Sequence, residues 1–258
     1  MNWKKWGAIV SLLLVFWVWQ EWPDGRLQVV FCDVGQGDSA VVVLRSFQAL
    51  IDTGANKVKL TECLSRQMPF WDRKIEVVFI SHSDKDHIGA LEEVRVRYKV
   101  EKIIDQPRRN DVVRFGSLSF DIIKGNEPEE GVKINGENES NARSVVMRVA
   151  YGSFSALFTG DIVTDSELAL VERGVLNKTE VLKVSHHGSK YGSAKEFLEV
   201  LRPKLAIISV GGKNNYGHPN GDTLMRLEEV GTKILRTDTM GTVSLMTDGK
   251  TLEVFREK

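Results

Sequence analysis

The run SHSDKDHIGA at residues 81–90 places two imidazoles and two carboxylates within six consecutive positions. His82, Asp84, Asp86 and His87 are of the types that bind divalent metal ions, and one tight loop holds such ligands together at little entropic cost. Each of the five histidines in the chain lies just beyond a segment with the composition of a buried strand. Because open sheets place their ligands at strand ends, this pattern predicts a metal site.

Three later segments supply further candidate ligands. Asp161 ends the segment FTGD, His186 and His187 follow EVLKVS, and His218 lies in the loop after LAIISV. A carboxylate can bridge two cations because it has two oxygens, which an imidazole cannot do. Taken alone, Asp161 would fit equally well as the N-cap of the helix that follows it.

Alternating strand and helix patterns predict the framework that positions these loops. Strands are expected at residues 27–33, 40–44, 47–51, 75–80, 100–104, 118–123, 145–149, 154–158, 181–184, 205–210, 234–236, 242–246 and 252–255. Helices are expected at 59–68, 88–98, 165–173, 194–201 and 223–230, the last ended by Gly231, and the polar segment 125–142 is expected to be a long loop. Two mixed β/α halves favour two sheets packed face to face, with helices outside.

The composition is that of a globular protein of one large domain or two small ones. The 258 residues are 42% hydrophobic and 27% charged, and Lys+Arg and Asp+Glu both number 35. A net charge of zero argues against strong non-specific nucleic-acid binding but leaves nucleic acid open as a substrate. The two cysteines form no disulfide framework: Cys32 lies in an apolar run typical of an inert buried thiol, and a single disulfide with Cys63 remains compatible with the sequence.

The first 26 residues have a different composition. Lys4 and Lys5 precede an apolar run at 6–19 that is broken only by Ser11. This pattern predicts an N-terminal membrane anchor or signal segment, and we favour an uncleaved anchor because no small-x-small cleavage site follows. A cleaved signal or an ordinary buried helix are the alternatives. The lysines predict a cytoplasmic N-terminus, which would leave residues 27–258, the expected hydrolase domain, on the extracytoplasmic side, or secreted if the segment is cleaved.

Six segments in fixed order resemble the metallo-β-lactamase superfamily, and within it the soluble domain of ComEC-type DNA-uptake proteins and their stand-alone relatives. They are DVGQGDS (33–39), IDTG (51–54), SHSDKDHIG (81–89), the stretch from Ser144 to FTGD (144–161), KVSHHGS (183–189) and GHP (217–219). The resemblance implies an α/β fold, an αββα four-layer sandwich with two divalent metal ions, Zn²⁺ or Mn²⁺, at one edge of the sheets.

The resemblance also implies roles for individual residues. His82 and Asp84 would bind one metal ion, Asp86 and His87 the other, Asp161 would bridge them, and His218 would be a late ligand. His186 and His187 would provide a ligand and a proton donor, in an order that the sequence leaves open; with Asp86 they are the catalytic candidates. Candidate substrate contacts are Asn141, Ser144, Ser189 and Asn215. The segments DVGQGDS and IDTG, with Asp33, Asp38 and Asp52, are expected to be scaffold.

Two features depart from the usual superfamily pattern. Asp84 stands where many members have histidine, and no histidine lies between His87 and His186, where Asn141 and Ser144 fall instead. More oxygen and fewer nitrogen ligands favour harder ions, so Mn²⁺ becomes plausible beside Zn²⁺.

Paired divalent metals activate water and stabilise an in-line displacement, so the sequence favours a hydrolase. The resemblance implies a phosphodiesterase that acts on DNA, which we expect to be single-stranded. Residues of the same loops could contact phosphate or stack a base, or could instead form a solvated rim: Lys183, Lys190, Lys213, Asn214, Asn215 and Tyr216. Alternatives are a hydrolase of small esters, thioesters or lactams, and a non-enzymatic, membrane-tethered DNA-uptake module. With a single apolar span, any DNA channel would come from a separate protein.

Overall fold

The computed structural model describes Trp6 and residues 25–69, 71–127 and 139–256. The predicted anchor or signal segment therefore lies outside the described residues except for Trp6, Gly25 and Arg26. Within the described residues, no helix is both long and apolar enough to cross a lipid bilayer.

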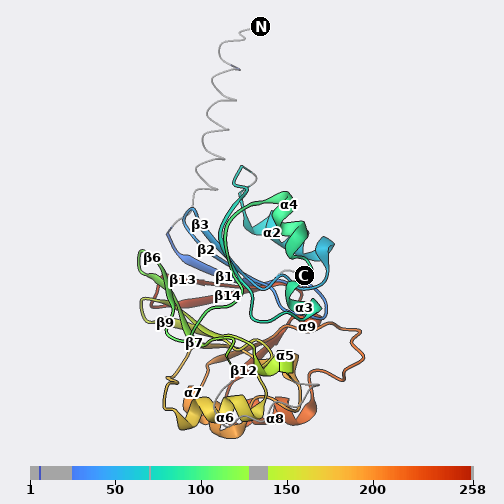
Figure 1. The fold of residues 1–258 in the computed structure, drawn as a ribbon, viewed down its shortest axis with the longest axis vertical. Coiled ribbons are helices and arrows are strands. Elements are labelled where there is room, and N and C mark those ends of the chain that lie inside the picture. Colours follow the sequence, from blue (N-terminus) through green and yellow to red (C-terminus); the bar gives the residue numbers. More distant parts are fainter. Residues whose placement is uncertain (1–5, 7–24, 70, 128–138, 257–258) are drawn as a thin grey trace.

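Two seven-stranded sheets form the centre of the molecule (Figure 1). The first has the order β14 (Leu252–Arg256), β13 (Val243–Thr247), β1 (Leu27–Phe31), β2 (Ala40–Leu44), β3 (Phe47–Ile51), β4 (Lys74–Phe79) and β5 (Lys99–Ile104). The second has the order β12 (Lys233–Arg236), β11 (Leu205–Ile208), β10 (Val181–Lys183), β9 (Phe154–Phe158), β8 (Val146–Tyr151), β7 (Leu118–Lys124) and β6 (Val112–Phe115).

Helices cover the outer face of each sheet. Figure 1 shows α2 (Lys57–Gln67) and α4 (Leu91–Arg97) on one side and α6 (Thr164–Glu172), α7 (Lys195–Leu201) and α8 (Gly221–Glu229) on the other. The short helices are α3 (Lys85–Ile88), α5 (Glu139–Ala142) and α9 (Thr237–Met240), with a 3₁₀ turn, η2, at Ser185–Gly188. The predicted αββα sandwich is confirmed.

Three apolar clusters hold the four layers together. One lies between the sheets and includes Val29 and Phe120. A second joins the first sheet to α2 and α4 through Leu60 and Val94, and a third joins the other sheet to α6, α7 and α8, with Leu198 among its residues. Strands buried on both faces need near-continuous apolar runs such as AVVVL in β2, and such runs can be recognised in the sequence.

Each sheet has an antiparallel half and a parallel half. In the first sheet β3, β4 and β5 run parallel, and in the second β9, β10, β11 and β12 do. The carboxyl ends of these parallel strands open onto the loops that contain the histidines, so the polar residues collect at one edge.

The structure corrects several details of the predicted elements. The segment at 88–98 is split into α3 and α4, and α5 ends the segment expected to be a loop. Strand β6 and helix α9 were not predicted; β6 (VVRF) is a short edge strand whose residues are mostly exposed, so it lacks a buried pattern. Gly231 follows the C-cap of α8 with φ 76°, as predicted.

The cysteines form a disulfide, so the interpretation of Cys32 as an inert thiol is wrong. Cys32 and Cys63 are both buried, their Cα atoms are 5.9 Å apart, and they are separated by 31 residues. The bond ties the end of β1 to α2, a proximity in space that sequence spacing does not reveal.

Reduction of this disulfide should lower the free energy of unfolding by about 3–4 kcal/mol, because it releases a long loop in the unfolded chain. Urea unfolding with and without dithiothreitol measures the loss. The double variant Cys32→Ala/Cys63→Ala is the control and should not respond to the reductant; an equal response would assign the effect to something other than this bond.

Candidate metal centre

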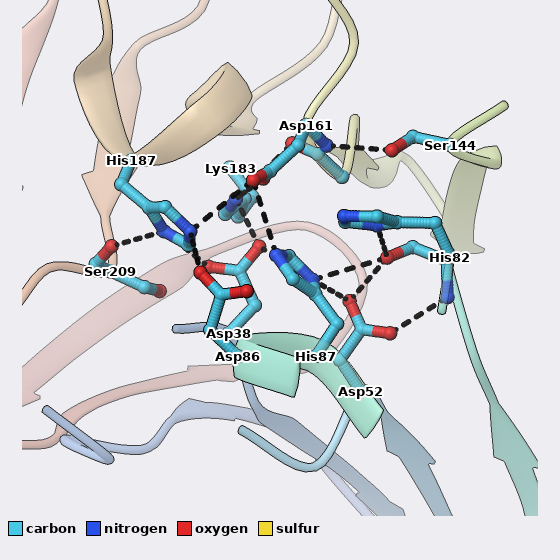
Figure 2. A network of polar contacts seen from close by, with 12 residues as sticks. Asp38, Asp52, His82, Asp86, His87, Ser144, Asp161, Lys183, His187 and Ser209 are labelled. Carbon is cyan, nitrogen blue, oxygen red and sulfur yellow. Dashed lines mark hydrogen bonds and ion pairs between the residues drawn. The ribbon is translucent and has the colours of Figure 1, made fainter. Parts of the chain in front are cut away.

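The ends of four parallel strands bring the candidate ligands together. Asp52 follows β3, His82 follows β4, Asp161 follows β9, and His186 and His187 lie in η2 after β10. Helix α3 begins directly after Asp84 and places Asp86 and His87 in its single turn. Segments far apart in the sequence thus meet at one edge of the two sheets (Figure 2).

Four side chains form a compact donor set. The ligand atoms of Asp86, His87, Asp161 and His187 all lie within 4.8 Å of one another. Asp161 Oδ2 is 3.3 Å from His87 Nε2 and 3.4 Å from His187 Nε2, and Asp86 Oδ2 is 3.2 Å from the same His187 nitrogen. Asp161 Oδ2 therefore lies within 3.4 Å of the Nε2 atoms of both imidazoles, and its role as a bridging ligand stays a prediction.

Asp52 fixes the orientation of two of the imidazoles. His87 Nδ1 donates to Asp52 Oδ2 at 2.9 Å, and His82 Nδ1 donates to Ser81 Oγ at 3.0 Å, while that hydroxyl donates to the same Asp52 oxygen at 2.8 Å. The Ser81 backbone N–H donates to Asp52 Oδ1 at 2.7 Å. Since the Nδ1 protons are committed, the Nε2 atoms are left to face the site, the arrangement that metal-binding histidines usually have.

His187 is oriented in the same way from the second sheet. Its Nδ1 donates to the backbone carbonyl of Ser209 at 2.9 Å, which leaves Nε2 for the donor set. The backbone of this turn is left-handed at His186 and His187, with φ 49° and 53°, a conformation that side chains other than glycine rarely adopt. The neighbouring structure must therefore hold this turn in place.

Unsatisfied buried atoms show that the site fits metal ions. Among the described residues, His82 Nε2, His87 Nε2 and Asp161 Oδ1 are buried without a hydrogen-bond partner. Such atoms are rare in folded proteins and costly unless something else binds them. A mixed set of imidazoles and carboxylates suits Zn²⁺ and Mn²⁺.

The protonation of His87 and His187 reflects the carboxylates around them. Burial by itself would lower the pKa of His87, but the Asp161 and Asp52 carboxylates outweigh it and raise that pKa to about 10. The pKa of His187 is raised in the same way by Asp161 and Asp38 against the effect of burial. Divalent cations would supply the positive charge that these imidazoles otherwise take from protons.

The remaining predicted ligands surround this donor set. Asp84 Oδ2 lies 3.4 Å from His82 Nε2, on the first-sheet side. On the other side, the His186 ring is 5.5 Å from the His218 ring between centroids, and His186 Nε2 is 3.9 Å from Asp161 Oδ2. Burial lowers the pKa of both, that of His218 to about 4, so these two imidazoles are neutral at neutral pH.

Glycines in two of the motifs allow the loops to approach closely. A Cβ atom on Gly37 would overlap the backbone carbonyl of Asp86, and Gly37 has φ 127°. A Cβ atom on Gly160, with φ 51°, would lie 3.1 Å from the Ser81 side chain. DVGQGDS and FTGD thus need glycine because each packs directly against another loop of the site.

The four predicted substrate contacts differ in position. Asn215 is exposed in the loop after β11, and Asn141 in α5 is half-buried. Ser144 is fully buried and its hydroxyl accepts from the Asp161 backbone N–H at 3.1 Å, and Ser189 is 2% exposed. We therefore assign Ser144 to the support of Asp161 instead of to substrate binding.

Three residues that the sequence assigned to the scaffold or to substrate contacts lie directly behind the candidate ligands. Asp52 orients His82 and His87, Asp38 lies 3.3 Å from His187 Nδ1, and Lys183 is buried behind Asp161. Lys183 therefore does not line an exposed surface, and its expected contact with phosphate is wrong. All three lie in segments of the family resemblance, DVGQGDS, IDTG and KVSHHGS, and this position was the only indication in the sequence that they belong to the site.

Comparisons with known proteins agree with this arrangement. The family described as "Metallo-beta-lactamase superfamily" matches residues 32–213. The chain is 29% identical to ComE operon protein 3 of Bacillus subtilis (strain 168), over 85% of this chain and 33% of that protein. It is 28% identical to competence protein ComA of Neisseria gonorrhoeae, over 92% of this chain and 35% of that protein. The chain thus spans about a third of these relatives' length.

Solved structures show the same fold at low identity. CmlA, a diiron β-hydroxylase from Streptomyces venezuelae, matches with a TM-score of 0.59 and 14% identity over 91% of this chain and 55% of that chain. The metallo-β-lactamase fold protein YhfI from Bacillus subtilis matches with a TM-score of 0.56 and 12% identity, over 84% and 99%. The chain belongs to the metallo-β-lactamase superfamily, whose members are generally metal-dependent hydrolases, and it is related to ComEC-type competence proteins.

Replacing Asp52 should weaken metal binding although Asp52 is not in the four-residue donor set. The two Asp52 oxygens together accept hydrogen bonds from His87 Nδ1, the Ser81 hydroxyl and the Ser81 backbone N–H. An asparagine side chain has only one oxygen and cannot accept all three. Asp52→Asn should therefore reduce Mn²⁺ or Zn²⁺ affinity by roughly 10–100-fold. Competition with a chelating dye measures this affinity.

The matched control is Asp33→Asn, in the neighbouring motif. Asp33 accepts from the Gly35 backbone N–H and pairs with Lys59, away from the donor set, so metal affinity should stay unchanged. An equal loss in both variants would contradict the role given to Asp52.

Glu167 of α6 is the residue that holds the strained histidine turn. Its Oε1 accepts from Ser185 Oγ at 2.6 Å and from the Ser193 backbone N–H at 2.8 Å, and its Oε2 accepts from the Ala194 backbone N–H at 2.7 Å. Burial raises the pKa of Glu167 to about 7, against these hydrogen bonds and the Arg226 charge.

The raised pKa of Glu167 fixes the sign of a pH effect. The fold favours the protonated carboxyl, so its stabilising contribution is complete below the unfolded pKa of about 4.5 and is lost as pH rises through about 7. The unfolding free energy of the wild type minus that of Glu167→Gln should fall by up to about 3 kcal/mol between these limits. Urea unfolding of metal-free protein at pH 5 and pH 8 tests this. Glu172→Gln, exposed on the same helix, should show no such change.

Proposed function

We propose that this protein is a metal-dependent phosphodiesterase that cleaves single-stranded DNA. The observation that carries the proposal is the donor set of Asp86, His87, Asp161 and His187, with unsatisfied ligand atoms. The similarity to competence proteins along most of this chain supports DNA as the substrate. We further propose a link to DNA uptake, with a separate DNA-channel protein as partner.

Bound divalent metals would lower the pKa of water and stabilise charge on the oxygens of an in-line displacement. His82, Asp84, Asp86, His87, Asp161, His187 and His218 would hold two such ions, Zn²⁺ or Mn²⁺. His187 is committed through both ring nitrogens, so proton transfer falls to His186, whose Nδ1 has no hydrogen-bond partner among the described residues. As a neutral imidazole it can take a proton from the attacking water and return it to the leaving oxygen.

An aromatic ring beside the site supports a nucleic-acid substrate. Tyr216 is 70% exposed, and its ring stacks on the His218 ring with centroids 5.8 Å apart. An exposed ring next to a hydrolytic centre can stack a nucleobase, a contact that tolerates any sequence. Asn215 adjoins Tyr216 in the same loop and can contact the substrate there.

The disulfide supports a position outside the cytoplasm. Disulfides persist in oxidising compartments and are rare in the cytosol, so the Cys32–Cys63 bond agrees with a domain on the extracytoplasmic side. We propose that residues 6–19 tether it to the cytoplasmic membrane.

The proposal predicts release of nucleotides from labelled single-stranded DNA in the presence of Mn²⁺ or Zn²⁺. His87→Ala should abolish cleavage. Tyr216→Ala should raise KM for DNA by about 5–150-fold, the range for loss of one stacked base, while hydrolysis of a small phosphodiester such as bis-p-nitrophenyl phosphate is retained. Phe255→Ala, which removes an exposed aromatic ring on β14, is the control and should leave KM unchanged.

Two results would contradict the proposal. Metal-loaded protein that hydrolyses thioesters but no phosphodiester belongs to the small-substrate class. Metal-loaded protein that hydrolyses neither substrate but binds DNA is a non-enzymatic module.

A further inference from the structure

Lys183 brings a positive charge into the interior of the site. It is the last residue of β10, only 2% exposed, and its ammonium forms an ion pair with Asp38, a residue of the loop between β1 and β2. The Nζ atom also donates to the Gly160 carbonyl at 3.3 Å and lies 3.8 Å from Asp161 Oδ1. Figure 2 shows Lys183 behind Asp161, on the inner side of the donor set.

The ammonium lies beside a second group of potential ligands. Asp38, Asp52 and His87 have donor atoms within 4.8 Å of one another, and all three are buried. This inner group shares His87 with the outer donor set of Asp86, His87, Asp161 and His187. Taken as residue types alone, the inner group could bind a further divalent ion.

The cavity that adjoins Asp38 and Asp52 of the inner group is too small for a hydrated ion. A cavity of about 20 Å³ adjoins Asp38, Asp52 and Lys183, with mostly apolar residues such as Phe31, Phe79 and Phe158 around it. That volume holds about one water molecule. A divalent ion there would have to shed its water and would face the Lys183 charge at short range, which is strongly unfavourable.

We propose that the Lys183 ammonium is a permanent cation of this metal centre, which the chain itself supplies. It neutralises Asp38 and faces Asp161 from the inner side, so that the carboxylates stay in place before any metal ion binds. It also keeps divalent ions out of the inner group and confines them to the outer donor set. Lys183 is thus a positioning residue that acts through Asp38 and Asp161, and its role does not depend on which substrate the centre hydrolyses.

The test uses the full chain after removal of metal with EDTA. Lys183→Met keeps the length of the side chain and removes the charge, so the buried Asp38 carboxylate loses its ammonium partner and keeps only the contacts with His187 and His87. Breaking a buried pair in this way should lower Tm by about 10 °C. The double variant Lys183→Met/Asp38→Asn removes both charges and should recover at least half of that loss.

A second measurement separates charge from packing. Added Mn²⁺ should raise the Tm of Lys183→Met by several degrees more than that of the wild type, because the freed Asp38 carboxylate attracts the ion. The control is Lys59→Met, which removes the partly exposed Lys59–Asp33 pair and should change Tm by less than about 2 °C.

Three outcomes would overturn the proposal. One is a metal-free Tm of Lys183→Met equal to that of the wild type. Another is a double variant no more stable than the single variant, which would assign Lys183 a packing role. The third is equal stabilisation of Lys183→Met and wild type by Mn²⁺. If Lys183→Met does not fold, the double variant decides: a folded double variant supports the proposal and an unfolded one overturns it.

Discussion

Buried negative charge at one edge of two packed sheets is the constraint on which the rest of this structure depends. Asp38, Asp52 and Asp161 are 6%, 2% and 3% exposed, and each has a carboxylate oxygen within 4 Å of a His87 ring nitrogen. A buried carboxylate costs several kcal/mol unless a cation or several donors compensate it. The imidazoles, the Lys183 ammonium and the backbone N–H groups around these residues provide that compensation from within the chain.

The fold meets this constraint by placing parallel strand ends from both sheets at the same edge. The first sheet contributes Asp52, His82 and His87, and the second contributes Asp161 and His187. Neither sheet has a complete site, so the packing of the apolar cluster between the sheets sets the distances within the donor set. This explains why glycine is needed at Gly37 and Gly160, where loops from different elements approach too closely for a side chain.

Hydrogen bonds outside the donor set determine which imidazole nitrogens face it. Asp52 directs the Nε2 atoms of His82 and His87, and the Ser209 carbonyl directs that of His187. Glu167 holds the turn that contains His186 and His187 although it contacts neither ring. A mixed set of imidazoles and carboxylates oriented in this way agrees with the metal-dependent hydrolytic chemistry of the superfamily.

The sequence by itself determined the framework and the chemical type of the site. Buried strands on both faces gave long apolar runs, so most strands were predicted within one or two residues, and the histidines followed them closely enough to locate the centre. Edge strand β6 and the short helices α5 and α9 were missed because neither short nor exposed elements carry a periodic pattern.

The tertiary structure alone decided the contacts of Asp38, Asp52, Lys183 and Ser144, and the pairing of Cys32 with Cys63. Each depends on which residues of the other sheet or helix lie opposite, and that distance is set by packing between elements far apart in the chain. A lysine beside a histidine motif looks the same in sequence whether it contacts substrate or a buried aspartate. The strand register that turns Lys183 inward places it with Asp38.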